Sequence, residues 1–168
     1  TRLGYDVMMY DYPTFGKSKG ELNIKSLISD AQFMAEKFSQ DYDNVVLYGR
    51  SLGTGIATSV ASQQARIYKA LILETPYYSM RKMAETFIMI YPLKWILKFK
   101  LKTYKLIKNV NCSIFAFHGT KDELIPIKQA IRLKQENPRV DLTLVENGTH
   151  NDLPLYKEYQ SKLESILL

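Results

Sequence analysis

Residues 45–55 read VVLYGRSLGTG, an apolar run followed by G-x-S-x-G and then by small residues. The apolar run predicts a buried strand over 45–48, and the stretch 51–65, rich in Gly, Ala, Ser and Thr, predicts a helix. A turn this sharp strains the serine backbone, and glycines on both sides remove side chains that would collide. The segment therefore predicts Ser51 at a tight elbow, with its hydroxyl above a sheet at the start of a helix.

Short apolar runs and amphipathic helical stretches alternate on both sides of this segment. Asn23 is suited to cap one helix, Pro126 to be the first residue of another, and the last helix carries an apolar face from Tyr156 to Leu167. Further strands are expected at 5–10, 70–73, 113–117 and 140–145. Strand and helix alternation requires crossover connections, which give an α/β fold with a mainly parallel sheet and helices on both faces. We expect a single domain over residues 1–168, with an insertion at about 76–110.

Composition excludes several classes of protein. The chain has 168 residues, of which 46% are hydrophobic and 24% charged, and this balance fits one globular domain rather than a disordered or fibrous chain. Cys112 is the single cysteine, which excludes an internal disulfide and a cysteine-rich zinc site. No apolar run approaches the ~18 residues of a membrane-spanning helix. A strand-like run begins almost at Thr1, so we expect roughly a hundred residues to precede it in a longer protein.

The net charge of +6 comes from one segment. From Thr86 through Lys121 there is no acidic residue, whereas seven lysines fall in this stretch, so the remainder of the chain sums to about −1. These lysines form either a solvated face or, through those at 94–108, a docking surface for anionic lipid headgroups. Nucleic acid is disfavoured as a partner because no groove-reading motif accompanies the charge.

A reactive site in a parallel sheet lies beyond the carboxyl ends of the strands. A serine hydroxyl is a weak nucleophile at neutral pH, so Ser51 needs a base, and the base needs an orienting partner. Of the two histidines, His150 lies in the loop after the strand at 140–145, while His118 ends the preceding strand. We assign the base to His150, and packing and hydrogen bonding at the strand end to His118. The alternative for Ser51 is a simple helix N-cap.

The orienting acid is assigned to Asp122, which lies in a loop that leaves a strand and enters a helix. Glu123 and Asp152 are the competing carboxylates, and an ordinary turn or cap is the alternative role for Asp122. Asp122 is preferred because it gives the chain order Ser, Asp, His at the tips of three separate strands.

Five segments carry a resemblance to a known family. They are YDYPTFGKSKG at 10–20, YGRSLGTG at 48–55, LETP at 73–76, HGTKD at 118–122 and GTHND at 148–152. In this order they resemble the α/β-hydrolase superfamily, most closely its abhydrolase-domain branch of serine aminopeptidase-like and lysophospholipase-like hydrolases. The resemblance implies Ser51 as nucleophile, Asp122 as triad acid, His150 as base and the Leu52 N–H as one oxyanion donor, with no metal or organic cofactor.

The chain departs from the family at its front. The family completes its sheet with strands before Tyr5, and a loop there supplies the second oxyanion N–H. Losing one such donor costs about 10²- to 10³-fold in rate, so we expect these 168 residues alone to bind substrate yet hydrolyse it slowly.

The basic insertion lies where the family places a lid over the active site. Its apolar side chains either line a substrate pocket or pack the lid onto the core; the expected substrate contacts are Met83, Phe87, Tyr91 and Trp95. Together these features predict a serine hydrolase that cleaves a carboxylic ester or thioester of an apolar acyl substrate. A peptidase or acyltransferase would use the same triad, and a non-catalytic binding or membrane-docking protein on the same fold is the alternative from another class.

Overall fold

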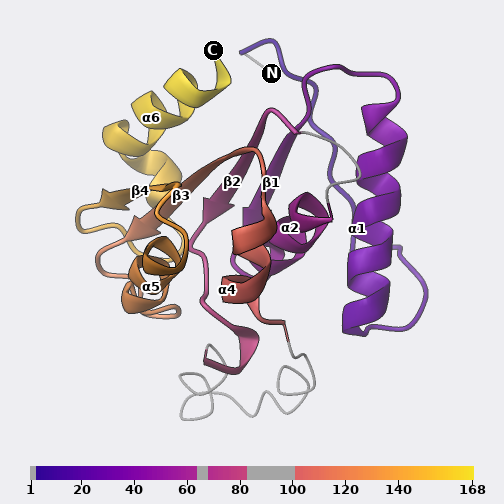
Figure 1. Ribbon diagram of the computed structural model, residues 1–168, viewed down its shortest axis with the longest axis horizontal. Coiled ribbons are helices and arrows are strands. Elements are labelled where there is room, and N and C mark those ends of the chain that lie inside the picture. Colours follow the sequence, from indigo (N-terminus) through magenta and orange to yellow (C-terminus); the bar gives the residue numbers. More distant parts are fainter. Residues whose placement is uncertain (1–2, 64–67, 83–100) are drawn as a thin grey trace.

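A parallel sheet forms the centre of the molecule in the computed structural model, which describes residues 3–63, 68–82 and 101–168 (Figure 1). Its strands are β1 (Val46–Arg50), β2 (Ala70–Glu74), β3 (Ser113–Gly119) and β4 (Val140–Val145). They pair in the order β1-β2-β3-β4, and every pairing is parallel. The carboxyl ends of these four described strands therefore lie at one edge of the sheet, and the loops that follow them meet there.

Helices cover both faces of the sheet, as the sequence predicts. One face carries α2 (Leu52–Ser62), α5 (Lys128–Glu136) and the short 3₁₀ helix Ile107–Asn109, with α1 (Ile24–Ser39) packed on α2. The other face is covered by α6 (Lys157–Leu167). None of the described helices is long and apolar enough to cross a membrane.

Helix α1 begins directly after its N-cap residue, Asn23. The Ser26 backbone N–H donates to Asn23 Oδ1 at 2.9 Å, and the Asn23 N–H donates back to Ser26 Oγ at 3.2 Å. This reciprocal capping box satisfies N–H groups that have no acceptor within the helix. Asn23 is therefore confirmed as the N-cap of this helix.

Within the part of the chain that the structure describes, the core has three parts. The largest lies between the sheet and α2 with α5, and a second lies under α6, where the apolar face from Tyr156 to Leu167 packs as predicted. The third lies beyond the carboxyl ends of the strands and includes Tyr77, Met80, Leu101 and Ile125, with the partly buried Leu52 packed against them. This third part supports the residue that directly follows Ser51.

The strand predicted at residues 5–10 is wrong. This segment is irregular, and the side chain of Met9 is 87% exposed. An extended segment becomes a strand only when a neighbour satisfies its backbone groups, and no described strand pairs with this one, since the sheet order ends at β1. Side chains hold it instead: the Tyr5 hydroxyl donates to the Leu167 carbonyl at 2.8 Å.

Two other expectations need adjustment. Helix α5 begins at Lys128 rather than at Pro126, whose carbonyl accepts the Gln129 N–H at 2.8 Å in a preceding turn. Residues 83–100, the middle of the predicted lid, lie outside the described residues. The ends of the predicted insertion belong to the body of the domain, because Tyr77, Leu101 and Ile107 are buried in the core.

Candidate active site

Ser51 stands at a strained turn between β1 and α2. Its backbone has φ 50° and ψ −117°, a left-handed conformation that a residue with a side chain rarely adopts. The turn is held by hydrogen bonds on both sides. The Ser51 N–H donates to the Glu74 carbonyl at 2.9 Å, and the Thr54 hydroxyl donates to the Ser51 carbonyl at 2.6 Å. The sequence-predicted elbow is therefore present.

The two glycines of the elbow play different parts. A Cβ added to Gly49 would lie 2.5 Å from the Gly53 carbonyl oxygen, so only glycine fits at 49. A Cβ added to Gly53 would come no closer than 3.4 Å to another group, the Tyr12 hydroxyl. The expectation that both glycines prevent a collision thus holds for Gly49 and is wrong for Gly53.

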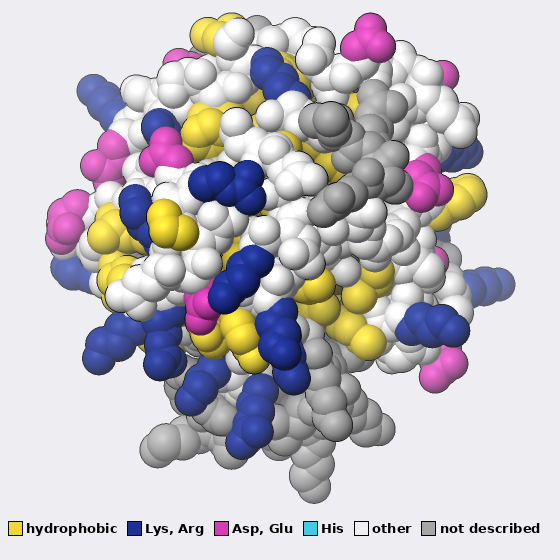
Figure 2. Space-filling view, in the orientation of Figure 1, with side chains coloured by type: hydrophobic (Ala, Val, Ile, Leu, Met, Phe, Trp, Pro, Cys, Tyr) yellow, Lys and Arg dark blue, Asp and Glu magenta, His cyan; other side chains and the backbone are white. Residues whose placement is uncertain are grey.

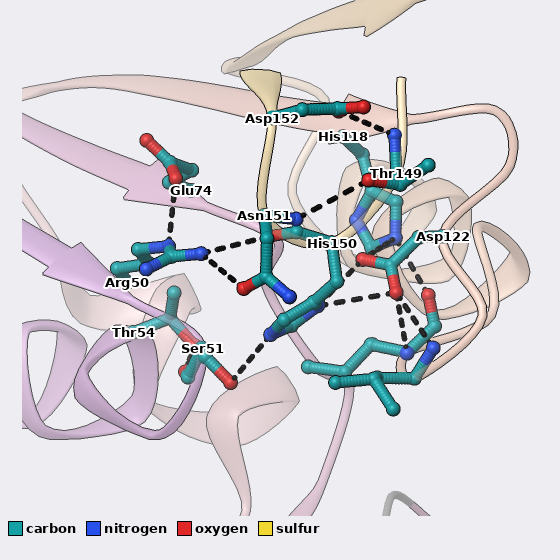
Figure 3. A network of polar contacts seen from close by, with 12 residues as sticks. Arg50, Ser51, Thr54, Glu74, His118, Asp122, Thr149, His150, Asn151 and Asp152 are labelled. Atoms are coloured by element: carbon teal, nitrogen blue, oxygen red, sulfur yellow. Dashed lines mark hydrogen bonds and ion pairs between the residues drawn. The ribbon is translucent and has the colours of Figure 1, made fainter. Parts of the chain in front are cut away.

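His150 joins Ser51 to Asp122 (Figure 3). Its Nε2 lies 3.2 Å from Ser51 Oγ, and its Nδ1 lies 2.9 and 3.1 Å from the two oxygens of Asp122. Because a carboxylate only accepts, the Nδ1–H donates to Asp122, and the unprotonated Nε2 is left to accept the serine O–H. The imidazole is nearly enclosed, with the residue 5% exposed. The three residues predicted from sequence are brought together in the arrangement that proton transfer requires.

The loops that carry Asp122 and His150 are tied to each other. The Lys121 N–H donates to the Gly148 carbonyl at 2.9 Å, and the Asn147 N–H donates to Thr120 Oγ1 at 2.8 Å. Gly119 makes this possible, because a Cβ there would collide with the Gly148 backbone. The imidazole and its carboxylate partner are thus held in place from the backbone as well as by their own contact.

Asp122 is fixed as an ionised acceptor. Burial by itself would raise the pKa of its carboxyl, but hydrogen bonds from His150 and from the Ile125 N–H outweigh this, and the pKa lies below its ordinary value. Its Oδ1 also accepts the N–H groups of Leu124 and Ile125 at 2.9 and 2.8 Å. A carboxylate held in this way orients an imidazole and stabilises the imidazolium that forms.

Two of the competing residues, Asp152 and His118, make other contacts. Asp152 Oδ1 accepts the Thr149 N–H at 2.7 Å, which closes the turn before His150. His118 is fully buried, and its Nε2 contacts the Ile125 carbonyl at 2.7 Å. Burial lowers the pKa of His118, so the ring is neutral and Nε2–H is the donor. His118 thereby supports the loop whose N–H groups hold Asp122.

Leu52 is the first residue of α2, directly after Ser51. The first N–H groups of a helix have no acceptor within it, and the helix dipole adds a partial positive charge there, so this N–H is suited to an oxyanion. The expected substrate contacts Met83, Phe87, Tyr91 and Trp95 lie outside the described residues. Within residues 3–63, 68–82 and 101–168, no cluster of His, Cys, Asp and Glu is arranged to hold a metal ion.

A polar network beside Ser51 and His150 was not predicted from the sequence. It consists of Arg50, Glu74 and two tyrosines, and Figure 3 shows Arg50 between Glu74 and the loop of His150. A signal for it exists in the sequence: Glu74 ends the strand ALILE, in which all five residues are buried.

Comparisons with known proteins give a consistent family. A family model described as serine aminopeptidase, S33 matches residues 1–109. Relatives include proteins named alpha/beta hydrolase domain-containing protein 17C from Mus musculus and Homo sapiens, each 28% identical over 174 residues and covering 99% of this chain. This chain covers 52% and 50% of those proteins, so it spans about half the length of the curated relatives it matches.

Solved structures share the fold. An esterase from Pyrococcus furiosus superposes with a TM-score of 0.77 at 16% identity, over 99% of this chain and 70% of that one. A structure from Nitrososphaera gargenis, described among carboxylesterases, gives a TM-score of 0.69 at 15% identity, over 91% and 74% of the two chains. At these identities the likeness shows the α/β-hydrolase fold.

Proposed function

The chain belongs to the serine aminopeptidase S33 family of α/β hydrolases, and on that premise we propose that it is a serine hydrolase acting on carboxylic esters or thioesters of an apolar acyl group. Ser51 is the nucleophile, His150 the general base and Asp122 the orienting acid. The observation that carries the proposal is the unbroken line of contacts from Ser51 Oγ through the imidazole to the Asp122 carboxylate.

The reaction follows from these contacts. As Ser51 Oγ attacks the substrate carbonyl, its proton passes to His150 Nε2, and the carbonyl oxygen takes up the negative charge. The Leu52 N–H stabilises that charge. His150 then gives the proton to the leaving alcohol or thiol, which leaves an acyl group on Ser51. Water deprotonated by His150 releases the acid and restores the serine.

Ester cleavage is preferred to peptide cleavage because esterases are prominent among the solved structures of this fold. The family description names an aminopeptidase, so peptide hydrolysis is the alternative within the same triad chemistry. We propose an apolar acyl group because the insertion is rich in apolar side chains. Its expected substrate contacts are Met83, Phe87, Tyr91 and Trp95.

We also propose that the basic segment docks on an anionic membrane surface. Lys102, Lys105 and Lys108 are exposed around the short helix α4 (Thr103–Leu106), while Thr103 and Ile107 between them are buried. Figure 2 shows Lys and Arg side chains gathered over the lower half of this face. Co-sedimentation with vesicles that contain phosphatidylserine tests this: Lys102→Glu with Lys105→Glu should lower binding, and equal binding would reject it.

The hydrolase proposal is tested by covalent labelling of the complete protein. A fluorophosphonate should label Ser51 in the wild type and should not label Ser51→Ala, while thermal unfolding shows both variants folded. Ester turnover by Ser51→Ala should fall by about four orders of magnitude. Chromogenic esters of increasing chain length, compared with aminoacyl anilides, separate esterase from peptidase activity. Labelling of both variants to the same extent would refute the assignment.

A further inference from the structure

We propose that Arg50 and Glu74 form a positioning pair that holds the His150 loop in place against Ser51. The inference rests on the proposed hydrolase function, since it concerns the distance between nucleophile and base. Neither residue contacts the imidazole ring or Ser51 Oγ, so their part is positioning and not catalysis.

Glu74 is the buried anchor of the pair. It is the last residue of β2 and only 1% exposed, in a strand otherwise made of apolar residues. Its carboxylate accepts from three side chains: Arg50 Nε at 2.9 Å, the Tyr159 hydroxyl at 2.6 Å and the Tyr48 hydroxyl. A buried carboxylate is costly unless paired and hydrogen-bonded, and these donors supply that compensation. They also fix the carboxylate in one orientation, facing Arg50.

Arg50 reaches from this anchor to the loop of the base. It stands opposite Glu74 in the β1-β2 register and directly precedes Ser51 in the chain. Its Nε faces Glu74, while its Nη2 donates to the His150 carbonyl at 3.0 Å and to Asn151 Oδ1 at 2.7 Å. Figure 3 shows the guanidinium lying between these groups. A planar guanidinium can donate to both sides at once, whereas an ammonium on a flexible stem cannot reproduce this geometry.

Among the described residues, the network adds a second link between Ser51 and His150, which otherwise meet through one hydrogen bond. Asp122 and His150 lie on loops tied together through Lys121 and Gly148, but Ser51 belongs to a different turn. Ser51 meets His150 at 3.2 Å through the hydrogen bond that the reaction itself consumes. Misplacement of a reacting group by about 1 Å costs on the order of 10²-fold in rate. A second link, from the residue beside the nucleophile to the backbone of the base, keeps this gap constant.

The test uses Arg50→Lys in the complete protein. This variant keeps a positive charge beside Glu74 but loses the planar guanidinium that donates to Glu74 and to the His150 loop at once. The matched control is Arg139→Lys, because Arg139 donates to the Val110 carbonyl at the opposite end of the sheet. Fluorophosphonate labelling is measured as a maximal rate and an apparent affinity. We expect the maximal rate of Arg50→Lys to fall about 10- to 100-fold with little change in affinity, and Arg139→Lys to match the wild type.

A rescue experiment separates positioning from loss of folding. Millimolar guanidinium added to Arg50→Ala should restore part of the labelling rate without changing the melting temperature, whereas methylammonium should not. Hydrogen exchange gives a readout that does not depend on chemistry: amides of residues 149–152 should exchange faster in Arg50→Lys than in the wild type.

The outcomes distinguish the two proposals. Labelling of Arg50→Lys at the wild-type rate, or a folded Arg50→Ala that guanidinium does not restore, would overturn the positioning role while the hydrolase function stands. If the wild type itself is not labelled, the hydrolase proposal fails. Hydrogen exchange then decides the contact alone: faster exchange at 149–152 supports the link to Arg50, and unchanged exchange overturns it.

Discussion

A Cβ added to Gly49 would lie 2.5 Å from the carbonyl oxygen of Gly53, which is closer than the two atoms can approach. This relationship separates two glycines that look equivalent in the motif. The backbone of residue 53 blocks position 49 whatever its side chain, whereas position 53 has room of its own. Strand β1 can pass this closely over the first turn of α2 only when residue 49 has no side chain.

Gly49→Ala should therefore destabilise the protein, by about 1–3 kcal/mol for an overpacked site, and should greatly slow the labelling of Ser51. Gly53→Ala is the matched control, and it should leave stability unchanged or raise it slightly because alanine favours a helix. Thermal unfolding and probe labelling of both variants check this. A Gly49→Ala protein with the stability and labelling of Gly53→Ala would contradict the account of the elbow.

Asp122→Asn should preserve the loop and remove most of the activity. The amide oxygen can still accept the Leu124 and Ile125 N–H groups, but the imidazole loses its anionic partner. In triads of this kind such a change lowers kcat by about 10⁴-fold. Asp152→Asn is the control, because Asn can still accept the Thr149 N–H. Steady-state ester hydrolysis decides: an Asp122→Asn enzyme as active as Asp152→Asn would remove Asp122 from the mechanism.

His118 should make stability depend on pH. Burial holds the pKa of His118 in the folded protein below its ordinary value of 6.5. Between these two pKa values the unfolded chain therefore binds more protons than the folded one. Stability from this site is complete above pH 6.5 and is lost as pH falls toward the folded pKa. His118→Gln keeps a donor for the Ile125 carbonyl but does not titrate. Its melting temperature should fall less than that of the wild type between pH 7 and pH 5, and parallel curves would be evidence against the effect.

Gly119→Ala should separate the loops of the acid and the base. The added Cβ would collide with the Gly148 backbone, which has no flexible end that could move aside. We expect a loss of about 1–3 kcal/mol and a labelling rate reduced by at least 10-fold. Denaturant unfolding and probe labelling measure both. If the variant keeps the wild-type labelling rate, the two loops are not required to be in contact.

The three triad candidates could be found from sequence because each follows a strand. Parallel strands gather their carboxyl ends at one edge, so Ser51, Asp122 and His150 had to lie near one another once the strands were correct. The α1 boundary was equally accessible, because the Asn23 cap is a local interaction between residues three apart. Fold class and candidate site thus depended on signals that the sequence carries locally or through topology.

The predictions that were wrong or missing concern contacts between residues that a local sequence pattern does not reveal. Residues 5–10 have the residue pattern of a strand, but a strand also needs a neighbouring strand, and a sequence pattern does not supply one. The Arg50–Glu74 pair was missed because its partners are 24 residues apart, although the position of Glu74 at the end of an apolar strand was a signal. The role of Gly53 was misjudged because a motif shows which residues are small but not which backbone atoms approach one another.

Hydrogen bonds tie residues 119–122 to residues 146–150, whereas Ser51 belongs to the separate turn after β1. The proposed proton acceptor and its counterion therefore lie in the tied loops, and the attacking oxygen lies in the turn. Gentle heating should thus disconnect the attacking oxygen from its acceptor before it separates the acceptor from its counterion. Inactivation would then occur at a lower temperature than loss of the helical signal. The Arg50 guanidinium, which links the turn to the tied loops, would determine the difference between those two temperatures.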